Sequence, residues 1–116
     1  MAETEFLSDE MLEKIMKKIL LCCSAGMSTS LLVTKMKKEA ENQGIDVEIN
    51  AVALELFEEN VTKYDVFLLG PQVKFKKNDF QKVADQYGKK VEVINMMDYG
   101  TMNGAKVLAF ALNLIK

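Results

Sequence analysis

KKILLCCSAGMSTS, residues 17–30, is the stretch that decides the fold we expect for this chain. Residues 17–22 bring a continuous apolar run after two lysines, which predicts a strand buried on both faces of a sheet. Residues 24–30 are small and mostly polar, which predicts a loop. From Leu31 onward apolar residues recur at helical spacing. This predicted helix ends at Gly44, because glycine readily adopts the left-handed conformation found at helix C-termini.

The rest of the sequence repeats this pattern of strand and helix. We expect strands over residues 46–52, 64–69 and 90–94, a short helix or turn over 54–60, and helices over 78–87 and 103–115. The first of these strands alternates apolar and polar residues, so we expect it near an edge. Pro71 ends the next strand because proline cannot donate to a ladder, and Asn78 is the predicted N-cap of the helix that follows.

Strands that alternate with helices across short connections form right-handed βαβ units. The chain is therefore predicted to adopt an α/β fold with an open parallel sheet and helices on both faces. Its 116 residues suit one domain, which can bury a core without disulfides or metals. In such folds the site lies at the carboxyl ends of the strands. Here that edge collects residues 23–30, 70–73 and 95–104.

Composition excludes several classes of function and location. The net charge is -2, which gives no electrostatic footprint for nucleic acid. The sequence has no run of about 18 apolar residues, so we expect no direct membrane insertion. Residues 1–13 lack the basic start and apolar centre of a signal peptide. Cys22 and Cys23 are adjacent and make a poor disulfide, so we expect a cytoplasmic protein with reduced thiols.

The chain contains no histidine. This removes the commonest general base, the commonest zinc ligand and the usual carrier of phosphohistidine. Any chemistry must then use cysteine, carboxylates, hydroxyls or backbone amides. We expect no metal and no cofactor.

The loop after the first strand has the character of a phosphate-binding loop. Backbone amides in such a loop, together with the N-terminus of the next helix, supply positive potential. Small residues let the backbone approach an anion closely, and hydroxyls add donors. The predicted loop consists of Ser24, Ala25, Gly26, Met27, Ser28, Thr29 and Ser30.

Cys23 stands where the strand meets this loop. The amides and the helix terminus favour the thiolate there, and the thiolate is the nucleophilic form. The alternative is that Cys23 is a small buried side chain and that the loop is an ordinary helix cap. Cys22 lies within the strand, so we expect it to face the core as an inert residue. The sequence thus favours Cys23 as a nucleophile that takes a phosphoryl group.

Residues 23–32, CSAGMSTSLL, resemble the active-site loop of the IIB proteins of the lactose, cellobiose and chitobiose class of bacterial sugar phosphotransferase systems. The resemblance continues in LLGPQV at 68–73 and in VEVI at 91–94, followed by Tyr99 and Gly100. It extends from about residue 17 to 116, and we expect the IIB domain to span residues 16–116.

The resemblance implies a four-stranded parallel sheet, for which we expect the strand order 2-1-3-4, with helices on both faces. It implies that Cys23 accepts a phosphoryl group from a phosphohistidine on a IIA protein. Cys23 would then pass the group to a sugar held by the membrane permease IIC, with which the protein would associate peripherally. Cellobiose, chitobiose and lactose all remain open as the sugar, and the oligomeric state is open too.

Two further sets of residues are expected near this site. The site rim is expected to comprise residues that match family segments beside the loop, namely Gly70, Pro71, Gln72 and Tyr99. The apolar part of a transient docking surface is expected to comprise Met27, Val73 and Phe75.

Two other classes compete with this interpretation. A low-molecular-weight cysteine phosphatase, or an arsenate-reductase-like enzyme, also places a cysteine after its first strand. Such phosphatases clamp the phosphate with an arginine six residues later, and here that position is Thr29. A flavodoxin-like binding module is the second competitor. The chain has no tryptophan and few candidate residues for stacking on a flavin.

Residues 1–15 depart from the family pattern. Apolar residues recur at helical spacing in this segment and just after it, at Leu7, Met11, Leu12, Ile15 and Met16. The spacing predicts a short amphipathic helix that packs on the domain. The alternative is a frayed extension that plays no part in it.

Overall fold

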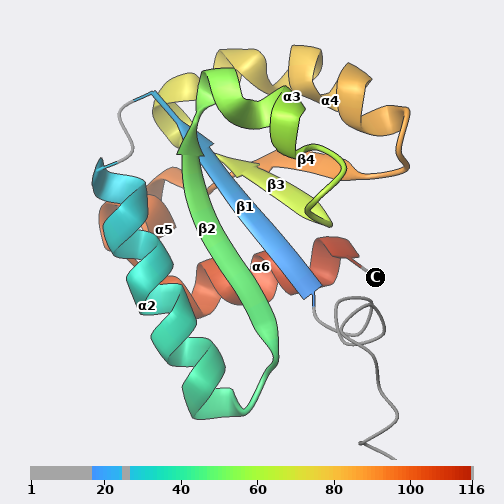
Figure 1. The fold of residues 1–116 in the computed structure, drawn as a ribbon. Helices are drawn as coiled ribbons and strands as arrows, with labels where there is room; N and C mark the ends of the chain where they lie inside the picture. The colour runs from blue at the N-terminus through green and yellow to red at the C-terminus, as the bar shows by residue number, and fades with distance from the viewer. Residues whose placement is uncertain (1–16, 25–26, 116) are drawn as a thin grey trace, which may run out of the picture.

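The computed structural model describes residues 17–24 and 27–115 of the chain, with the side chains of residues 27 and 28 outside this description (Figure 1). The expected helix over residues 1–15 therefore lies outside the described residues. The elements, with η marking 3-10 helices, are β1 (Lys17–Cys23), α2 (Met27–Gln43), β2 (Val47–Ala53), η2 (Leu54–Leu56), α3 (Phe57–Asn60), β3 (Val66–Leu69), η3 (Pro71–Lys76), α4 (Lys77–Asp85), β4 (Lys90–Val93), α5 (Met96–Gly100) and α6 (Gly104–Ile115).

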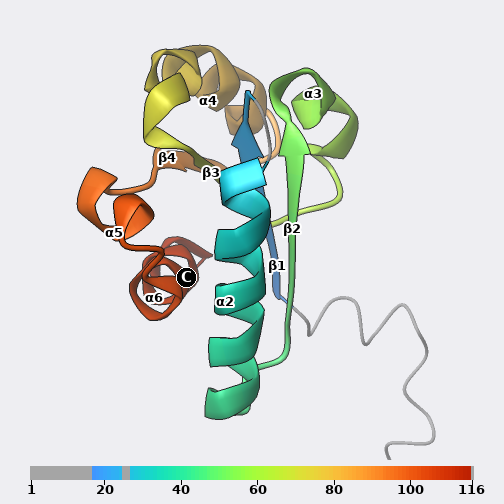
Figure 2. The same cartoon turned by 90° about the vertical axis from the view of Figure 1, so that its left-hand side faces the viewer.

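The four strands form one parallel sheet in the order β2-β1-β3-β4. Helices α2 and α6 cover one face of this sheet, and α3 and α4 cover the other (Figures 1 and 2). This confirms the predicted α/β fold and strand order. β1 lies inside the sheet and pairs along its whole length with β2, while β2 forms an edge as its alternating sequence predicted.

The apolar run of β1 supplies both halves of the core. Ile19 and Leu21 pack in a cluster with residues of α2 and α6. Leu20 and Cys22 point the opposite way, into a cluster with Phe57 of α3 and residues of α4. Successive side chains of a strand face opposite sides of the sheet, so a strand covered on both faces needs apolar residues at every position.

Two local predictions from the sequence are wrong, and one helix was not predicted. The predicted loop over residues 24–30 is shorter, because α2 already begins at Met27. The helix after β3 begins at Lys77, and Lys76 rather than Asn78 is its N-cap, because the unpredicted 3-10 helix η3 runs directly into it. The short helix α5 was also not predicted. It is capped by Asn95, whose side chain accepts from the backbone N–H groups of Met97 and Asp98.

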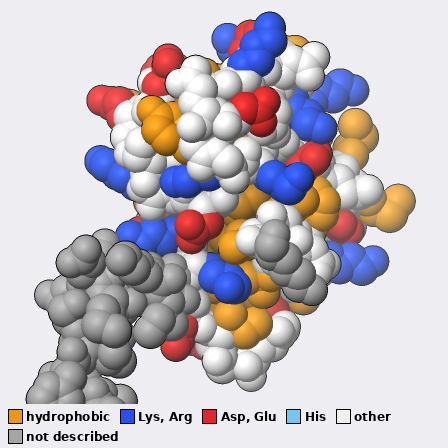
Figure 3. Space-filling model, turned by 90° about the vertical axis from the view of Figure 1, so that its right-hand side faces the viewer, with side chains coloured by type: hydrophobic (Ala, Val, Ile, Leu, Met, Phe, Trp, Pro, Cys, Tyr) orange, Lys and Arg blue, Asp and Glu red, His pale blue; other side chains and the backbone are white. Residues whose placement is uncertain are grey.

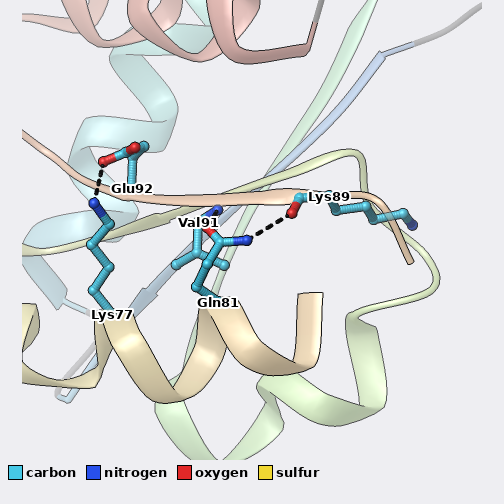
Figure 4. A network of polar contacts seen from close by, with 5 residues as sticks. All are labelled: Lys77, Gln81, Lys89, Val91 and Glu92. Carbon is cyan, nitrogen blue, oxygen red and sulfur yellow. Dashed lines mark hydrogen bonds and ion pairs between the residues drawn. The ribbon is translucent and has the colours of Figure 1, made fainter. Parts of the chain in front are cut away.

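The side chain of Gln81 of α4 forms hydrogen bonds with the outer edge of β4, where a fifth strand could otherwise pair (Figure 4). Its side-chain amide donates to the carbonyl of Lys89 at 3.0 Å and accepts from the N–H of Val91 at 2.9 Å. One residue of a neighbouring parallel strand would make the same pair of bonds. The side chain therefore satisfies part of an edge that would otherwise be open to pairing.

We expect Gln81→Ala to lower the free energy of unfolding by about 1–3 kcal/mol, because the Val91 N–H and the Lys89 carbonyl lose their partner. Urea denaturation followed by circular dichroism measures this change. Gln43→Ala is the matched control, because Gln43 is exposed and its side chain bonds only Glu39 one turn earlier. Equal stability of the two variants would contradict the role given to Gln81.

Gly104 lets α6 approach α2 closely. A Cβ atom built on Gly104 would lie 2.7 Å from the backbone carbonyl carbon of Lys35, which is closer than real Cβ atoms come. The helices must therefore separate if this position gains a side chain. Since Leu32 and Met36 of α2 meet Val107 of α6 in one buried cluster, that separation loosens half of the core.

We expect Gly104→Ala to destabilise the fold by about 1–3 kcal/mol through overpacking. Thermal unfolding measures the effect. Gly100→Ala is the control, because a Cβ atom at Gly100 meets nothing within 4 Å. Equal losses of thermal stability in the two variants would show that the close contact between α2 and α6 does not exclude a side chain at position 104.

Candidate functional site

The candidate site lies at the carboxyl end of the sheet, where β1 ends at Cys23 (Figure 1). Cys23 pairs in register with Ala53, the last residue of β2. On the other side the N–H of Gly70, just after β3, donates to the carbonyl of Cys22 at 3.2 Å. The segments that follow three strands thus meet around one cysteine.

The side chain of Cys23 contacts a buried hydroxyl. Its Sγ atom lies 3.0 Å from Oγ1 of Thr29, and these side chains are 1% and 0% exposed. Thr29 was expected in the loop but lies in the first turn of α2. The contact therefore joins the end of β1 to the start of α2. When Cys23 is a thiolate, its sulfur accepts this hydrogen bond and the Thr29 hydroxyl donates it.

Cys22 differs from its neighbour in both orientation and chemistry. It is fully buried in the cluster beneath α3 and α4, on the face of the sheet opposite α2. Burial, and secondly the charge of Cys23, raise the pKa of the Cys22 thiol to about 12. Cys22 therefore stays a protonated thiol at neutral pH, and its predicted place in the core is confirmed.

The other residues of the predicted loop are only partly described. Ser24 is exposed beside the end of β1, and Ser30 is exposed in the first turn of α2, where its carbonyl accepts from the Thr34 hydroxyl at 3.1 Å. Ala25 and Gly26 lie outside the described residues, as do the side chains of Met27 and Ser28. The side chain of Thr29 is brought into contact with Cys23.

The structure brings most of the predicted rim together. The side-chain amide of Gln72 donates to the hydroxyl of Tyr99 at 3.2 Å, which links η3 to α5. The same amide folds over Gly70, where an added Cβ atom would lie 2.7 Å from it. Pro71 begins η3 directly after Gly70. These residues bridge the ends of β3 and β4 beside the end of β1.

The expected docking role of Val73 is wrong. Val73 is 2% exposed and packs in the core cluster beneath α3 and α4. Val73 lies at a kink inside η3, with φ -120° and ψ 25°, and points inward, while Phe75 is 70% exposed. The sequence could not show this because η3 itself was not predicted.

Exposed methionines on α5 were missed by the sequence analysis. Met96 and Met97 are 71% and 74% exposed, and α5 follows β4 at the same edge of the sheet as Cys23. Leu31, in the first turn of α2, is half exposed at this edge too. The signal that could have found α5 is Asn95 as an N-cap directly before a pair of methionines.

The arrangement suits phosphoryl transfer through sulfur more than hydrolysis. Thr29 occupies the position six residues after the cysteine where a cysteine phosphatase has its arginine, and the whole chain contains no arginine. Among residues 17–24 and 27–115, no group of three or more His, Cys, Asp or Glu residues could hold a metal ion. Within that same part of the chain, no helix is long and apolar enough to cross a membrane.

Comparison with known proteins gives one consistent family. Residues 18–110 match the family model described as PTS system, lactose/cellobiose specific IIB subunit. An oligo-beta-mannoside-specific EIIB component from Bacillus subtilis is 54% identical over 100 residues, which cover 86% of this chain and 97% of that protein. A cellobiose-specific EIIB component from Lactococcus lactis is 49% identical over 104 residues, covering 85% of this chain and 96% of the relative.

Solved structures agree with these relatives. The solution structure of a cellobiose-specific phosphotransferase IIB component from Borrelia burgdorferi matches with a TM-score of 0.72 and 44% identity, over 85% of this chain and 91% of that one. A lactose-specific IIB domain from Streptococcus pneumoniae matches with a TM-score of 0.80 over 87% of this chain and 99% of that one, and at 21% identity it supports the fold alone. This chain belongs to the lactose/cellobiose-specific IIB family of the sugar phosphotransferase system.

Proposed function

We propose that Cys23 carries a phosphoryl group between a IIA protein and a sugar during uptake through a IIC permease. The observation that carries this proposal is the 3.0 Å contact between the Cys23 sulfur and the buried hydroxyl of Thr29, at the carboxyl end of a central strand. It sets Cys23 apart from Cys22, whose raised pKa keeps it protonated. The family to which the chain belongs supports the sugar phosphotransferase role.

The first step of the proposed relay forms phosphocysteine. The Cys23 thiolate attacks the phosphorus of phosphohistidine on IIA, so a sulfur–phosphorus bond forms and a phosphorus–nitrogen bond breaks. The imidazole keeps the electron pair of the broken bond and takes up the proton released by the thiol. Since this chain has no histidine, the donor group must come from a partner.

The second step returns the cysteine to its starting state. A sugar hydroxyl attacks the phosphorus, an oxygen–phosphorus bond forms, and Cys23 leaves as the thiolate, which recovers the hydroxyl's proton. Both steps are in-line displacements in which catalysis rests on positioning and charge stabilisation. In this proposal the Thr29 hydroxyl stabilises the thiolate, while the backbone amides and hydroxyls of residues 24–30 hold the phosphoryl oxygens.

A carrier must keep its phosphoryl group until the next partner docks. Rapid hydrolysis in cysteine phosphatases uses a bidentate arginine clamp and an acid for the leaving group. The lack of any arginine removes the clamp here, and the position is filled by the neutral Thr29. The phosphatase and arsenate-reductase alternatives are therefore not favoured.

Partners are expected to dock around Cys23 for short periods only. Exposed apolar side chains at this edge of the sheet fit a small transient interface, and they comprise Leu31, Phe75, Met96 and Met97. We propose that residues 16–116 form the working domain, acting in the cytoplasm beside the membrane permease. The names of the relatives include oligo-beta-mannoside, cellobiose and galactose, so we propose a sugar of this class, selected by the permease.

Cys23→Ser is expected to lower transfer of the phosphoryl group to sugar by more than about a hundredfold, because the nucleophile is lost. The assay combines the purified protein, the general phosphotransfer proteins, a IIA protein and permease vesicles, and measures labelled sugar phosphate. Cys22→Ala is the matched control and should stay close to the wild-type rate, since Cys22 only packs in the core. Undiminished transfer by Cys23→Ser would contradict the proposal.

Thr29→Val removes the hydroxyl that contacts Cys23 while keeping the shape of the side chain. We expect the rate of phosphorylation by IIA to fall about tenfold, because the Cys23 thiolate loses a hydrogen bond that favours it over the unreactive thiol. Rapid-quench measurement of phosphorylated protein gives this rate. Thr29→Ser should restore it, and Thr34→Val should leave it unchanged, because Thr34 bonds only to the Ser30 carbonyl. A Thr29→Val rate equal to wild type would remove Thr29 from the mechanism.

A further inference from the structure

We propose that the acidic segment of residues 1–16 binds in a pocket at the amino end of the sheet, on the same chain. This pocket has a volume of about 310 Å³ and lies between the start of β4 and the C-terminal end of α6. It is at the opposite end of the strands from Cys23 (Figure 1). The inference therefore does not depend on the proposed phosphoryl transfer.

The point at which the segment joins the domain lies beside the pocket. The backbone N–H of Lys18 donates to the carboxylate of Asp65 at 2.8 Å, and Asp65 lines the pocket. The start of β1 is thereby fixed to the wall of the pocket. A segment of 16 residues attached at Lys17, next to Lys18, is long enough to reach the pocket.

Helix α6 has more apolar surface than the described part of the chain covers. The sequence of this helix, GAKVLAFALNLI, is apolar on nearly every side, while only one side faces the sheet through residues such as Val107 and Leu108. A helix that is hydrophobic all round is usually covered on all sides. Leu114 and Ile115 are only partly buried, and they line the pocket together with the half-exposed Tyr87. Figure 3 shows hydrophobic side chains gathered in the middle of this face, with both basic and acidic side chains around them.

The pocket and the segment carry opposite charge. Lys89 and Lys90 line the pocket, and the starts of the strands add Lys17, Lys18 and Lys63, against three carboxylates, Asp46, Glu48 and Asp65. The segment itself carries five carboxylates and one lysine, namely Glu3, Glu5, Asp9, Glu10, Glu13 and Lys14. Opposite charges on the two partners favour this pairing.

The segment also carries the apolar side chains that such a pocket needs. Leu7, Met11, Leu12 and Ile15 recur at helical spacing, so its sequence offers one apolar and one acidic side. Because the segment is covalently attached, its effective concentration at the pocket is about millimolar, and modest contacts suffice to hold it. This tether is why we assign the pocket to this segment before a second copy or another protein.

Carbodiimide cross-linking of the full chain tests the proposal directly, because the reagent joins only carboxylates and amines that touch. We expect the cross-linked peptides to join Asp9, Glu10 or Glu13 to Lys89 or Lys90. Mixing ¹⁵N-labelled and unlabelled protein before the reaction distinguishes links within one chain from links between two chains. Links spread equally onto Lys74 and Lys76, at the opposite end of the sheet, would overturn the proposal, as would links mainly between chains.

A pair of substitutions tests the apolar contact. Leu12→Gln should lower the yield of these links about fivefold or more, the effect expected from losing the burial of one leucine. Lys14→Gln introduces the same residue on the charged side and should leave the yield unchanged. Hydrogen exchange of the full chain gives a second readout, with faster exchange around Lys90 in Leu12→Gln alone. Equal yields and equal exchange in the two variants would contradict the proposal.

Discussion

The contact between the Cys23 sulfur and the Thr29 hydroxyl is the interaction on which the geometry of the candidate site depends. It ties the last residue of a central strand to the first turn of the longest described helix. The strand is held on both sides by the sheet, and the helix is held by α6 through the close approach at Gly104. The position of one sulfur atom is thus set by packing that extends through half of the domain.

The alternation of side chains along β1 gives the two adjacent cysteines different surroundings. Cys22 faces the core beneath α3 and α4, where burial raises its pKa to about 12. Cys23, one residue later, meets a hydroxyl at the carboxyl edge. A chain without histidine or arginine then lacks both a donor of its own and the usual phosphate clamp. These absences suit a carrier that depends on partners for both of its steps.

Sequence patterns predicted the sheet well because both faces of β1 must be apolar in a covered parallel sheet. The apolar run after Lys18 predicted β1, and Gly44, whose φ is 68°, predicted the end of the following helix. Sequence patterns gave wrong predictions where contacts between distant parts of the chain determine whether a side chain is buried. Thr29 looked like a loop residue but is buried in α2, and Val73 looked exposed but turns inward within η3. The two rim residues Gln72 and Tyr99 meet through a helix, α5, that was not predicted.

Locating the phosphoryl group on the wild-type protein tests the central claim most directly. The protein is phosphorylated by the general phosphotransfer proteins and a IIA protein, digested with trypsin, and examined by tandem mass spectrometry. Residues 19–35 fall in one tryptic peptide that contains both cysteines, so fragment ions that separate Cys22 from Cys23 decide the matter. The account predicts the phosphoryl group on Cys23 alone. A phosphoryl group on Cys22, or on a serine or threonine of this peptide, would contradict it.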